Sequence, residues 1–288
     1  MIKFILLPFL LLISACDLLD QSNDSFFANF STQDLYNNEI HPTGSSIENG
    51  FDATLEEVLH MITQQGYANA YPSVFGEVKG STIAGYMDAA RGGYYESVPD
   101  SYPDSAWYHY SDKTCSYACQ ITEYFYWALS SILGAQEYTG SGSETRYQQV
   151  KDEWKLNTKT KMSTGDPNMY ALMTNGTYKI PTVIPNGSYA KSSEVGIAVS
   201  STLPSELSQI SSYFSSYVSV FGIHVVATSK VDNAKLLHAA YVLAEYLDNN
   251  EDGTVDDPDV LAKMKSKNCI LTIAYDSDEM DAIKEKLD

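Results

Sequence analysis

Basic side chains are scarce in this sequence. Its 18 lysines and arginines compare with 37 aspartates and glutamates, which gives a formal charge of −19 at pH 7. Nucleic acids and anionic membrane surfaces are bound by clusters of Lys and Arg. The composition therefore argues against both as partners. An acidic surface keeps a protein soluble and concentrates cations near it, but it does not identify a substrate.

Several catalytic signatures are also missing. The sequence has no Gly-x-Ser-x-Gly nucleophile elbow, no Walker phosphate-binding loop and no glycine-rich dinucleotide fingerprint. No repeat of fixed period occurs, and no second membrane segment follows the apolar N-terminal run. The chemistry must therefore be sought among isolated acidic and histidine side chains.

The one long apolar run lies at the start of the chain. Lys3 precedes about ten apolar residues, and the small-residue segment Ser14-Ala15-Cys16 follows them. The run is too short to span a bilayer and predicts a secretory signal over residues 1–16. Residues 13–16 also resemble the lipobox of bacterial lipoproteins. That resemblance implies lipidation at Cys16 and an anchored location in the cell envelope, outside the cytoplasm; an ordinary cleaved signal is the alternative.

Three cysteines remain after Cys16. Cys115 and Cys119 are close enough to form a small disulfide loop, which export permits, and Cys269 is then most simply a free thiol. A Cys-x3-Cys metal site is the weaker alternative, because no second pair of Cys or His lies nearby at zinc-ribbon spacing.

The pattern along the chain predicts an α+β fold. Residues 17–50 are polar and indicate a tether, residues 51–192 a mainly helical domain, and residues 217–288 a small α/β domain after a Ser-rich seam near 192–216. Helices are expected at 54–66, 83–90, 121–133, 144–157, 166–173, 234–247, 258–265 and the last ten residues, and strands at 218–228 and 270–274.

A tyrosine-rich stretch lies at residues 94–117, with six tyrosines beside Trp107. Loops of this composition can line a groove that binds a peptide or a glycan. The alternative is that these residues are half-buried side chains with a polar tip.

The first expected helix combines an apolar stripe with three polar residues. Glu56 and His60 lie one turn apart, and Glu57 lies beside them, so the pattern predicts an exposed patch with two carboxylates and an imidazole. Such a patch can hold a metal and activate water. It can also be a surface ion pair.

Glu123 is the only charge on the very hydrophobic segment 121–133. A carboxylate on a buried helix must be neutralised, hydrogen-bonded, paired or bound to a metal. A position in the first helical turn, where the helix dipole favours an anion, is a second explanation.

Residues 56–60 differ by one substitution from the His-Glu-x-x-His motif of zinc peptidases. Together with the later Glu123 helix they resemble the gluzincin subgroup. The resemblance implies Glu56, His60 and Glu123 as ligands, Glu57 as general base, and His109 as an extra ligand or oxyanion stabiliser. A His/Glu/Glu set is harder than His/His/Glu, so Mn²⁺ or Fe²⁺ is plausible beside Zn²⁺. A degenerate, non-catalytic relative is equally consistent.

Residues 248–259 carry the best-defined motif. They resemble the twelve-residue EF-hand loop, most closely its dockerin-type version that ends in Asp. The resemblance implies a Ca²⁺ site with the following ligands: Asp248, Asn250, Asp252, the Thr254 carbonyl, Asp256 and Asp259. Gly253 would make the sharp turn at position 6. An acidic turn without metal is the alternative.

Two other histidines, His224 and His238, are expected to be structural, although His238 shares a helix face with Glu245. The sequence therefore predicts a lipid-anchored calcium-binding protein that is either a peptidase-like, metal-dependent hydrolase or a non-catalytic binding or structural lipoprotein.

Overall fold

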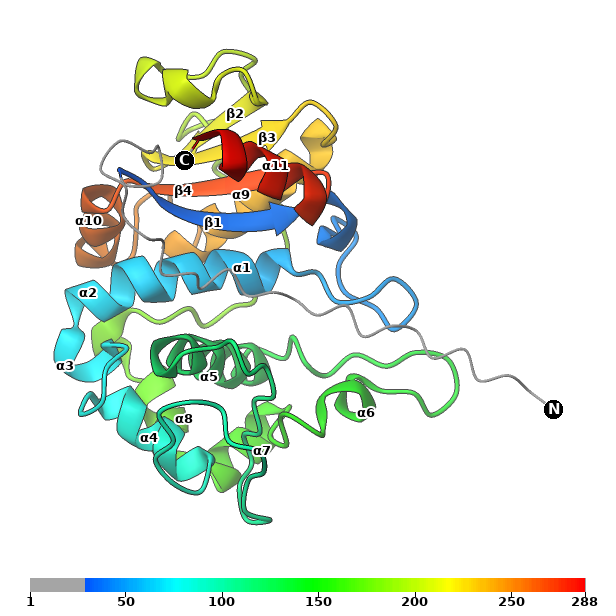
Figure 1. Ribbon diagram of the computed structural model, residues 1–288, viewed down its shortest axis with the longest axis vertical. Helices are drawn as coiled ribbons and strands as arrows, with labels where there is room; N and C mark the ends of the chain where they lie inside the picture. The colour runs from blue at the N-terminus through cyan, green and yellow to red at the C-terminus, as the bar shows by residue number, and fades with distance from the viewer. Residues whose placement is uncertain (1–28, 288) are drawn as a thin grey trace.

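The computed structural model describes residues 29–287. It has two lobes, one on each side of a central helix (Figure 1). A four-stranded sheet with its helices forms one lobe, and a group of helices and long loops forms the other. Helices account for 43% of the described residues and strands for 12%, so the mixed character expected from the sequence is confirmed.

The sheet has the strand order β1-β4-β3-β2. Its strands are β1 (Ser31–Tyr36), β2 (Phe214–Val220), β3 (Ile223–Thr228) and β4 (Cys269–Ala274). β1 and β3 each pair in parallel with β4, whereas β2 and β3 form an antiparallel hairpin.

Two sequence predictions are corrected by this sheet. The tether expected at residues 17–50 is wrong for residues 31–36, because these residues pair along their whole length with β4. The single strand expected at 218–228 is a hairpin, with Phe221 and Gly222 both at positive φ in its turn. Positive φ at two successive residues is the geometry of a tight hairpin, and glycine adopts it without strain.

Alternating side chains of the sheet face two different apolar clusters. On β3, Val225 packs in the larger cluster with α9 (Asn233–Leu247), while Val226 packs in the smaller one with α11 (Ser277–Leu287) and η5 (Ser205–Ile210). This period of two is the signature of a strand that is covered on both faces. The sheet is therefore the middle layer of its lobe.

The central helix is α1 (Thr54–Met61), which continues as the π-helical segment η3 (Ile62–Tyr67). α1 contacts β1 and α9 on one side and α5 (Tyr117–Ile132) on the other. All eight of its residues are buried, including Glu56, Glu57 and His60. The exposed patch expected here is therefore wrong, because both lobes cover this helix. A surface ion pair no longer describes these three residues.

The second lobe is built around α5 (Tyr117–Ile132), which begins after Ser116, whose side chain caps the helix. Glu123 is therefore in the second turn of α5 and not in the first, so the helix dipole does not account for its burial. The remaining helices are α2 (Ala68–Ala70), α3 (Pro72–Phe75), α4 (Thr82–Ala90), α6 (Arg146–Val150), α7 (Lys159–Gly165), α8 (Pro167–Met173), α10 (Pro258–Ser266), η2 (Asn37–Glu39) and η4 (Gly176–Tyr178).

One apolar cluster joins the two lobes. It runs from Leu271 on β4 through Leu59 on α1 to Leu129 on α5. Because this cluster includes residues of both lobes, the Ser-rich seam at 192–216 does not separate two independent cores.

The helix expected at 144–157 is shorter in the structure, where it is limited to α6. The helix α7 was not expected from the sequence.

The cysteines are paired as their spacing indicated. Cys115 and Cys119 form a disulfide at the start of α5, and Cys269 is a free, buried thiol. No helix within residues 29–287 is long and apolar enough to cross a membrane. Cys16 and the signal segment lie outside the described residues.

Candidate metal centre

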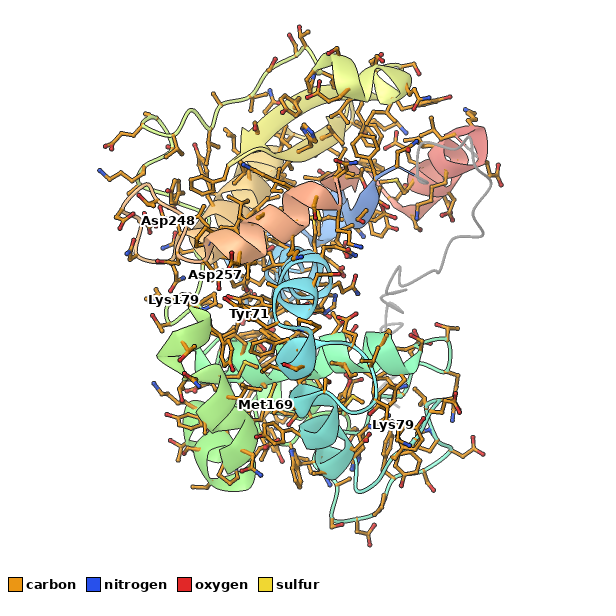
Figure 2. All side chains as sticks on the ribbon, turned by 90° about the vertical axis from the view of Figure 1, so that its left-hand side faces the viewer. Tyr71, Lys79, Met169, Lys179, Asp248 and Asp257 are labelled. Carbon is orange, nitrogen blue, oxygen red and sulfur yellow. A yellow bond between two sulfur atoms is a disulfide. The ribbon has the colours of Figure 1, made fainter. Side chains whose placement is uncertain are left out.

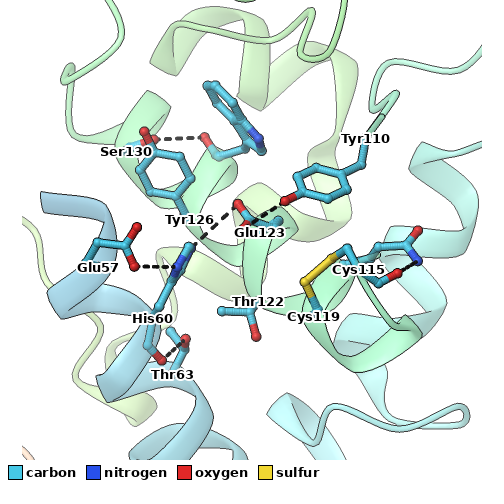
Figure 3. A network of polar contacts seen from close by, with 12 residues as sticks. Glu57, His60, Thr63, Tyr110, Cys115, Cys119, Thr122, Glu123, Tyr126 and Ser130 are labelled. Carbon is cyan, nitrogen blue, oxygen red and sulfur yellow. Dashed lines mark hydrogen bonds and ion pairs between the residues drawn. A yellow bond between two sulfur atoms is a disulfide. The ribbon is translucent and has the colours of Figure 1, made fainter. Parts of the chain in front are cut away.

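α1 and α5 bring Glu56, His60 and Glu123 together between the lobes. Figure 3 shows His60 and Glu123. Each residue offers a ligand atom, and the three atoms lie within 4.8 Å of one another. Within residues 29–287, this is the one group of three or more Asp, Glu, His or Cys side chains that converges in this way. The structure therefore places together the three residues that the sequence suggested as transition-metal ligands.

The spacing of these atoms fits a metal ion. His60 Nε2 lies 3.6 Å from Glu123 Oε2, which is too long for a hydrogen bond. Two metal–ligand bonds of about 2.1 Å at a tetrahedral angle would hold their ligand atoms about 3.4 Å apart. His60 Nε2 is buried and has no hydrogen-bond partner. A buried ring nitrogen without a partner is costly, and a metal would satisfy it.

Burial sets the electrostatics of the centre. Glu56, His60 and Glu123 are 9%, 2% and 3% exposed. Burial raises the pKa of Glu56 to about 7 and that of Glu123 to about 8, although the nearby His60 opposes both shifts. Without a cation, both carboxyls therefore hold protons at pH values where ordinary carboxyls are ionised. A divalent ion would replace those protons.

Two tyrosines hold the carboxyl groups in place. Tyr110 donates its hydroxyl hydrogen to Glu123 Oε1 at 3.2 Å. Tyr126 hydrogen-bonds Glu56, and its ring meets the His60 ring edge-on with centroids 5.8 Å apart. Metal-ligating carboxylates are commonly supported by such donors. Tyr126 has no distinguishing sequence signal, and Tyr110 was expected only as part of the tyrosine-rich stretch at residues 94–117.

Glu57 lies on the other edge of the imidazole. Its Oε2 is 3.7 Å from His60 Nδ1 and accepts a hydrogen bond from Gln33 Nε2 at 2.5 Å. Burial raises the pKa of Glu57 to about 8. Glu57 is therefore near the candidate ligands but faces the ring nitrogen that points away from them. Gln33 was missed because it lies in the segment expected to be a tether.

A further carboxyl lies close to the centre. Glu153 Oε1 accepts a hydrogen bond from Trp127 Nε1 at 2.9 Å, and burial raises its pKa to about 7. Arg146 favours the ionised forms of both Glu56 and Glu153. Neither Glu153 nor Arg146 carries a local sequence signal, because the fold brings α6 and the turn after it against α5.

His109 has partners outside the centre. Its Nε2 lies 3.0 Å from the Ala106 carbonyl oxygen, and its ring stacks on Tyr102 with centroids 5.2 Å apart. The structure therefore does not bring His109 into the Glu56–His60–Glu123 group, and the neighbouring Tyr110 occupies the contact with Glu123 instead.

His238 and Glu245 share a helix but have different partners. His238 Nε2 lies 2.7 Å from Asp52 Oδ2, and both side chains are buried. Glu245 accepts hydrogen bonds from the backbone amides of Asn186 and Gly187. These contacts tie separate segments to α9.

The proposed calcium loop connects α9 to α10. Asp248 is fully buried and accepts hydrogen bonds from the backbone amides of Asp252 and Gly253, and Gly253 has φ +92° as a sharp turn requires. Tyr189 donates its hydroxyl hydrogen to the same side chain. The carboxylates of the loop do not form a second converging group in the part of the chain that the structure describes. The calcium site stays a prediction.

The other expected ligand positions are also placed by the structure. Asn250 and Asp252 accept backbone hydrogen bonds within the loop, Asp256 Oδ2 accepts one from the Asn249 amide, and Asp259 is exposed in the first turn of α10. The adjacent Asp257 caps α10 and accepts a hydrogen bond from Tyr71 at 2.7 Å, at the junction of the two lobes (Figure 2).

The tyrosine-rich segment is partly internal. Tyr108 and Tyr110 are buried, and Tyr102 donates its hydroxyl hydrogen to the Tyr110 carbonyl at 2.7 Å. Tyr94 is 44% exposed, with the Lys79 ammonium 3.5 Å from its ring centroid. Much of the aromatic surface therefore packs inside the lobe, and a peptide- or glycan-binding groove stays a prediction.

Comparison with known proteins finds no relative. No family model, curated protein or solved structure matches the chain. The resemblances to the lipobox, the EF-hand loop and the gluzincin motif therefore stay predictions.

Proposed function

We propose that this chain is a metal-binding protein in which Glu56, His60 and Glu123 hold a divalent transition metal between the two lobes. The observation that carries the proposal is the buried Nε2 of His60, which has no hydrogen-bond partner and lies beside two carboxyl groups. An imidazole with two carboxylates suits Zn²⁺, Mn²⁺ or Fe²⁺. Because α1 packs on the sheet and α5 belongs to the other lobe, the ion would fasten the lobes together.

Metal analysis tests this proposal. The wild-type protein is expected to take up about one equivalent of Zn²⁺ or Mn²⁺, and Glu123→Gln and His60→Ala are expected to weaken binding by more than about 100-fold, since even supporting partners are worth 10- to 100-fold. His224→Ala removes a histidine on β3 and should leave uptake unchanged. Isothermal titration after treatment with a chelator measures these affinities. The proposal fails if the wild-type protein binds neither metal more tightly than Glu123→Gln does.

Peptide-bond hydrolysis of the zinc-peptidase type is the second candidate. The observation that favours it is the meeting of His60 with a glutamate from a later, buried helix, as the resemblance to gluzincins implies. Hydrolysis also requires that a peptide reach residues that are at most 9% exposed. A fluorogenic peptide library incubated with the metal-loaded protein tests it. Cleavage that persists in Glu123→Gln would point to a contaminating enzyme.

We also propose that residues 248–259 bind Ca²⁺ and stabilise the α9–α10 connection. The support is the match of the ligand spacing to an EF-hand loop, together with a glycine at positive φ in position 6. Lipid attachment at Cys16 would place the protein on the outer side of a membrane, and palmitate labelling with a Cys16→Ser control tests that part.

Calcium is expected to raise the melting temperature. At a free concentration 100 times the Kd, binding stabilises the folded protein by about 2.7 kcal/mol, which corresponds to roughly 5–10 °C for a chain of this size. Asp252→Ala should lose the response, whereas Asp278→Asn, which changes an exposed acidic residue on α11, should keep it. Differential scanning calorimetry in Ca²⁺ and in chelator measures the shift. Equal melting temperatures in the two buffers would contradict the calcium site.

A further inference from the structure

Glu57 and Glu123 lie at opposite edges of the His60 ring (Figure 3). Glu57 Oε2 is 3.7 Å from Nδ1, and Glu123 Oε2 is 3.6 Å from Nε2. We propose that Glu57 is the positioning residue of the centre: it holds the His60 proton on Nδ1 and leaves the Nε2 lone pair directed at the metal. The inference rests on the proposed metal site and assigns Glu57 a role other than general base.

The hydrogen bond from Gln33 supports this assignment. Gln33 Nε2 donates to Glu57 Oε2, the same oxygen that faces His60 Nδ1. At 3.7 Å the contact between Oε2 and Nδ1 is electrostatic, and a carboxylate held in this place by Gln33 favours the tautomer with the proton on Nδ1. Metal-binding histidines commonly have a carboxylate as the partner of their second ring N–H, which fixes the tautomer and the ring orientation.

Gln33 also connects the centre to the sheet. It lies on β1, is 6% exposed and pairs in register with Leu271 on β4. Glu57 is therefore held by β1, a strand that the sequence did not predict. Pairing of β1 with β4 would determine how firmly Glu57 is held, and through it the orientation of His60.

A general-base role requires a different arrangement. A base that activates a metal-bound water must lie within reach of the metal side of the centre, which is the Nε2 side of His60. Glu57 lies on the Nδ1 side, with its contacting oxygen engaged by Gln33. The positioning role therefore predicts a defined His60 tautomer in the metal-free protein, and this tautomer can be measured without any reaction.

Nitrogen-15 NMR of histidine-labelled, metal-free protein tests the tautomer directly. In the wild type at pH 8, His60 is expected to show a protonated Nδ1 and an unprotonated Nε2. Glu57→Ala is expected to shift the ring toward the Nε2–H tautomer. Glu39→Gln is the matched control, because it removes the charge of another partly buried carboxyl near Glu57 and does not alter Glu57 itself. His60→Ala assigns the signal.

Zn²⁺ titration of the same variants supplies a second measurement. Glu57→Ala is expected to lower the affinity by about 10- to 100-fold, and Gln33→Ala by a smaller factor, because it loosens Glu57 without removing it. Glu39→Gln should bind within about twofold of the wild type. If Glu57→Ala does not fold, Gln33→Ala carries the test, with the tautomer shift and the weaker affinity expected in the same direction.

The outcomes separate this inference from the metal proposal. An Nε2–H tautomer in the wild-type protein, or a Glu57→Ala protein with unchanged tautomer and affinity, would overturn the positioning role while leaving the ligands in place. A wild-type protein that binds no metal but has the Nδ1–H tautomer, lost in Glu57→Ala, would overturn the metal site and leave the contact of Glu57 with His60 established.

Discussion

In the metal-free protein, the free energy of unfolding is expected to fall by about 3 kcal/mol as the pH rises from 6.5 to 8. Burial raises the pKa values of Glu57 and Glu123 from the ordinary 4.5 to about 8 in the folded chain. Between these values the folded protein holds protons that the unfolded chain has released, so a higher pH favours unfolding. Two carboxyls at about 1.4 kcal/mol per pH unit, each half ionised by pH 8, give this magnitude.

Three histidines oppose the carboxyls in the lower part of this pH range. Burial lowers the pKa values of His41, His109 and His224 below 6.5, so these residues make the protein more stable as the pH rises toward 6.5. In the unfolded chain these histidines have the ordinary pKa of about 6.5, so their opposing effect continues, at decreasing size, to about pH 7.5. Above that value the buried carboxyls determine the slope, which is negative.

A bound metal is expected to reverse this dependence. The ion requires ionised Glu56 and Glu123, so binding strengthens as these groups lose their protons and the metal-loaded protein gains stability over the same range. Urea unfolding at pH 6.5, 7.25 and 8, in chelator and in Zn²⁺, measures both slopes. Glu123→Gln should flatten the slope in chelator and abolish the effect of zinc. A metal-free protein that becomes more stable toward pH 8 would contradict the argument.

The sequence predicted α1 but not its surroundings. Apolar residues at helical spacing identify a helix and the face that meets the first core. They do not reveal a second lobe, and α5 covers the face that carries Glu56 and His60. An amphipathic pattern therefore concealed a fully buried polar centre, because the cover comes from a different part of the chain.

β1 shows why some elements leave no local signal. Among its six residues, only Leu35 is an aliphatic core residue, and Gln33 and Asp34 are buried because they have specific partners. The Thr272 hydroxyl, 239 residues away from Gln33, donates to its carbonyl oxygen and also to Asp34. Buried polar groups of this kind depend on the tertiary structure. No window of sequence around residues 31–36 contains that information.

The candidate metal ligands could be predicted from the sequence for a chemical reason. A lone Glu on an apolar helix needs a partner, and the resemblance to gluzincins suggested His60. The supporting residues Tyr126 and Gln33 were not accessible, since a tyrosine or glutamine in a folded chain is usually unremarkable. Ligands can be inferred from the cost of burying a charge, whereas the groups that position them follow from packing.

Replacing Arg91 by alanine is expected to lower the free energy of unfolding by about 3–5 kcal/mol. Its side chain is fully buried, with Nη2 2.7 Å from Asp88 Oδ1 and Nη1 donating to Gln120 Oε1 at 2.5 Å. Nη2 also donates to the Tyr95 carbonyl at 3.1 Å. Removal of the guanidinium leaves these acceptors without their cation in a site with little access to water, and that loss is the main part of the expected cost.

Lys191→Ala is the matched control, because Lys191 and Glu194 have the same i, i+3 spacing at 2.8 Å but side chains that are 33% and 66% exposed. It should change stability by less than about 0.5 kcal/mol. Arg91→Ala should also weaken metal binding, since Gln120 lies one turn before Glu123 and anchors the start of α5. Urea unfolding and Zn²⁺ titration measure both effects. If Arg91→Ala and Lys191→Ala lower the free energy of unfolding equally, burial does not make the Arg91–Asp88 pair more important for stability than an exposed pair.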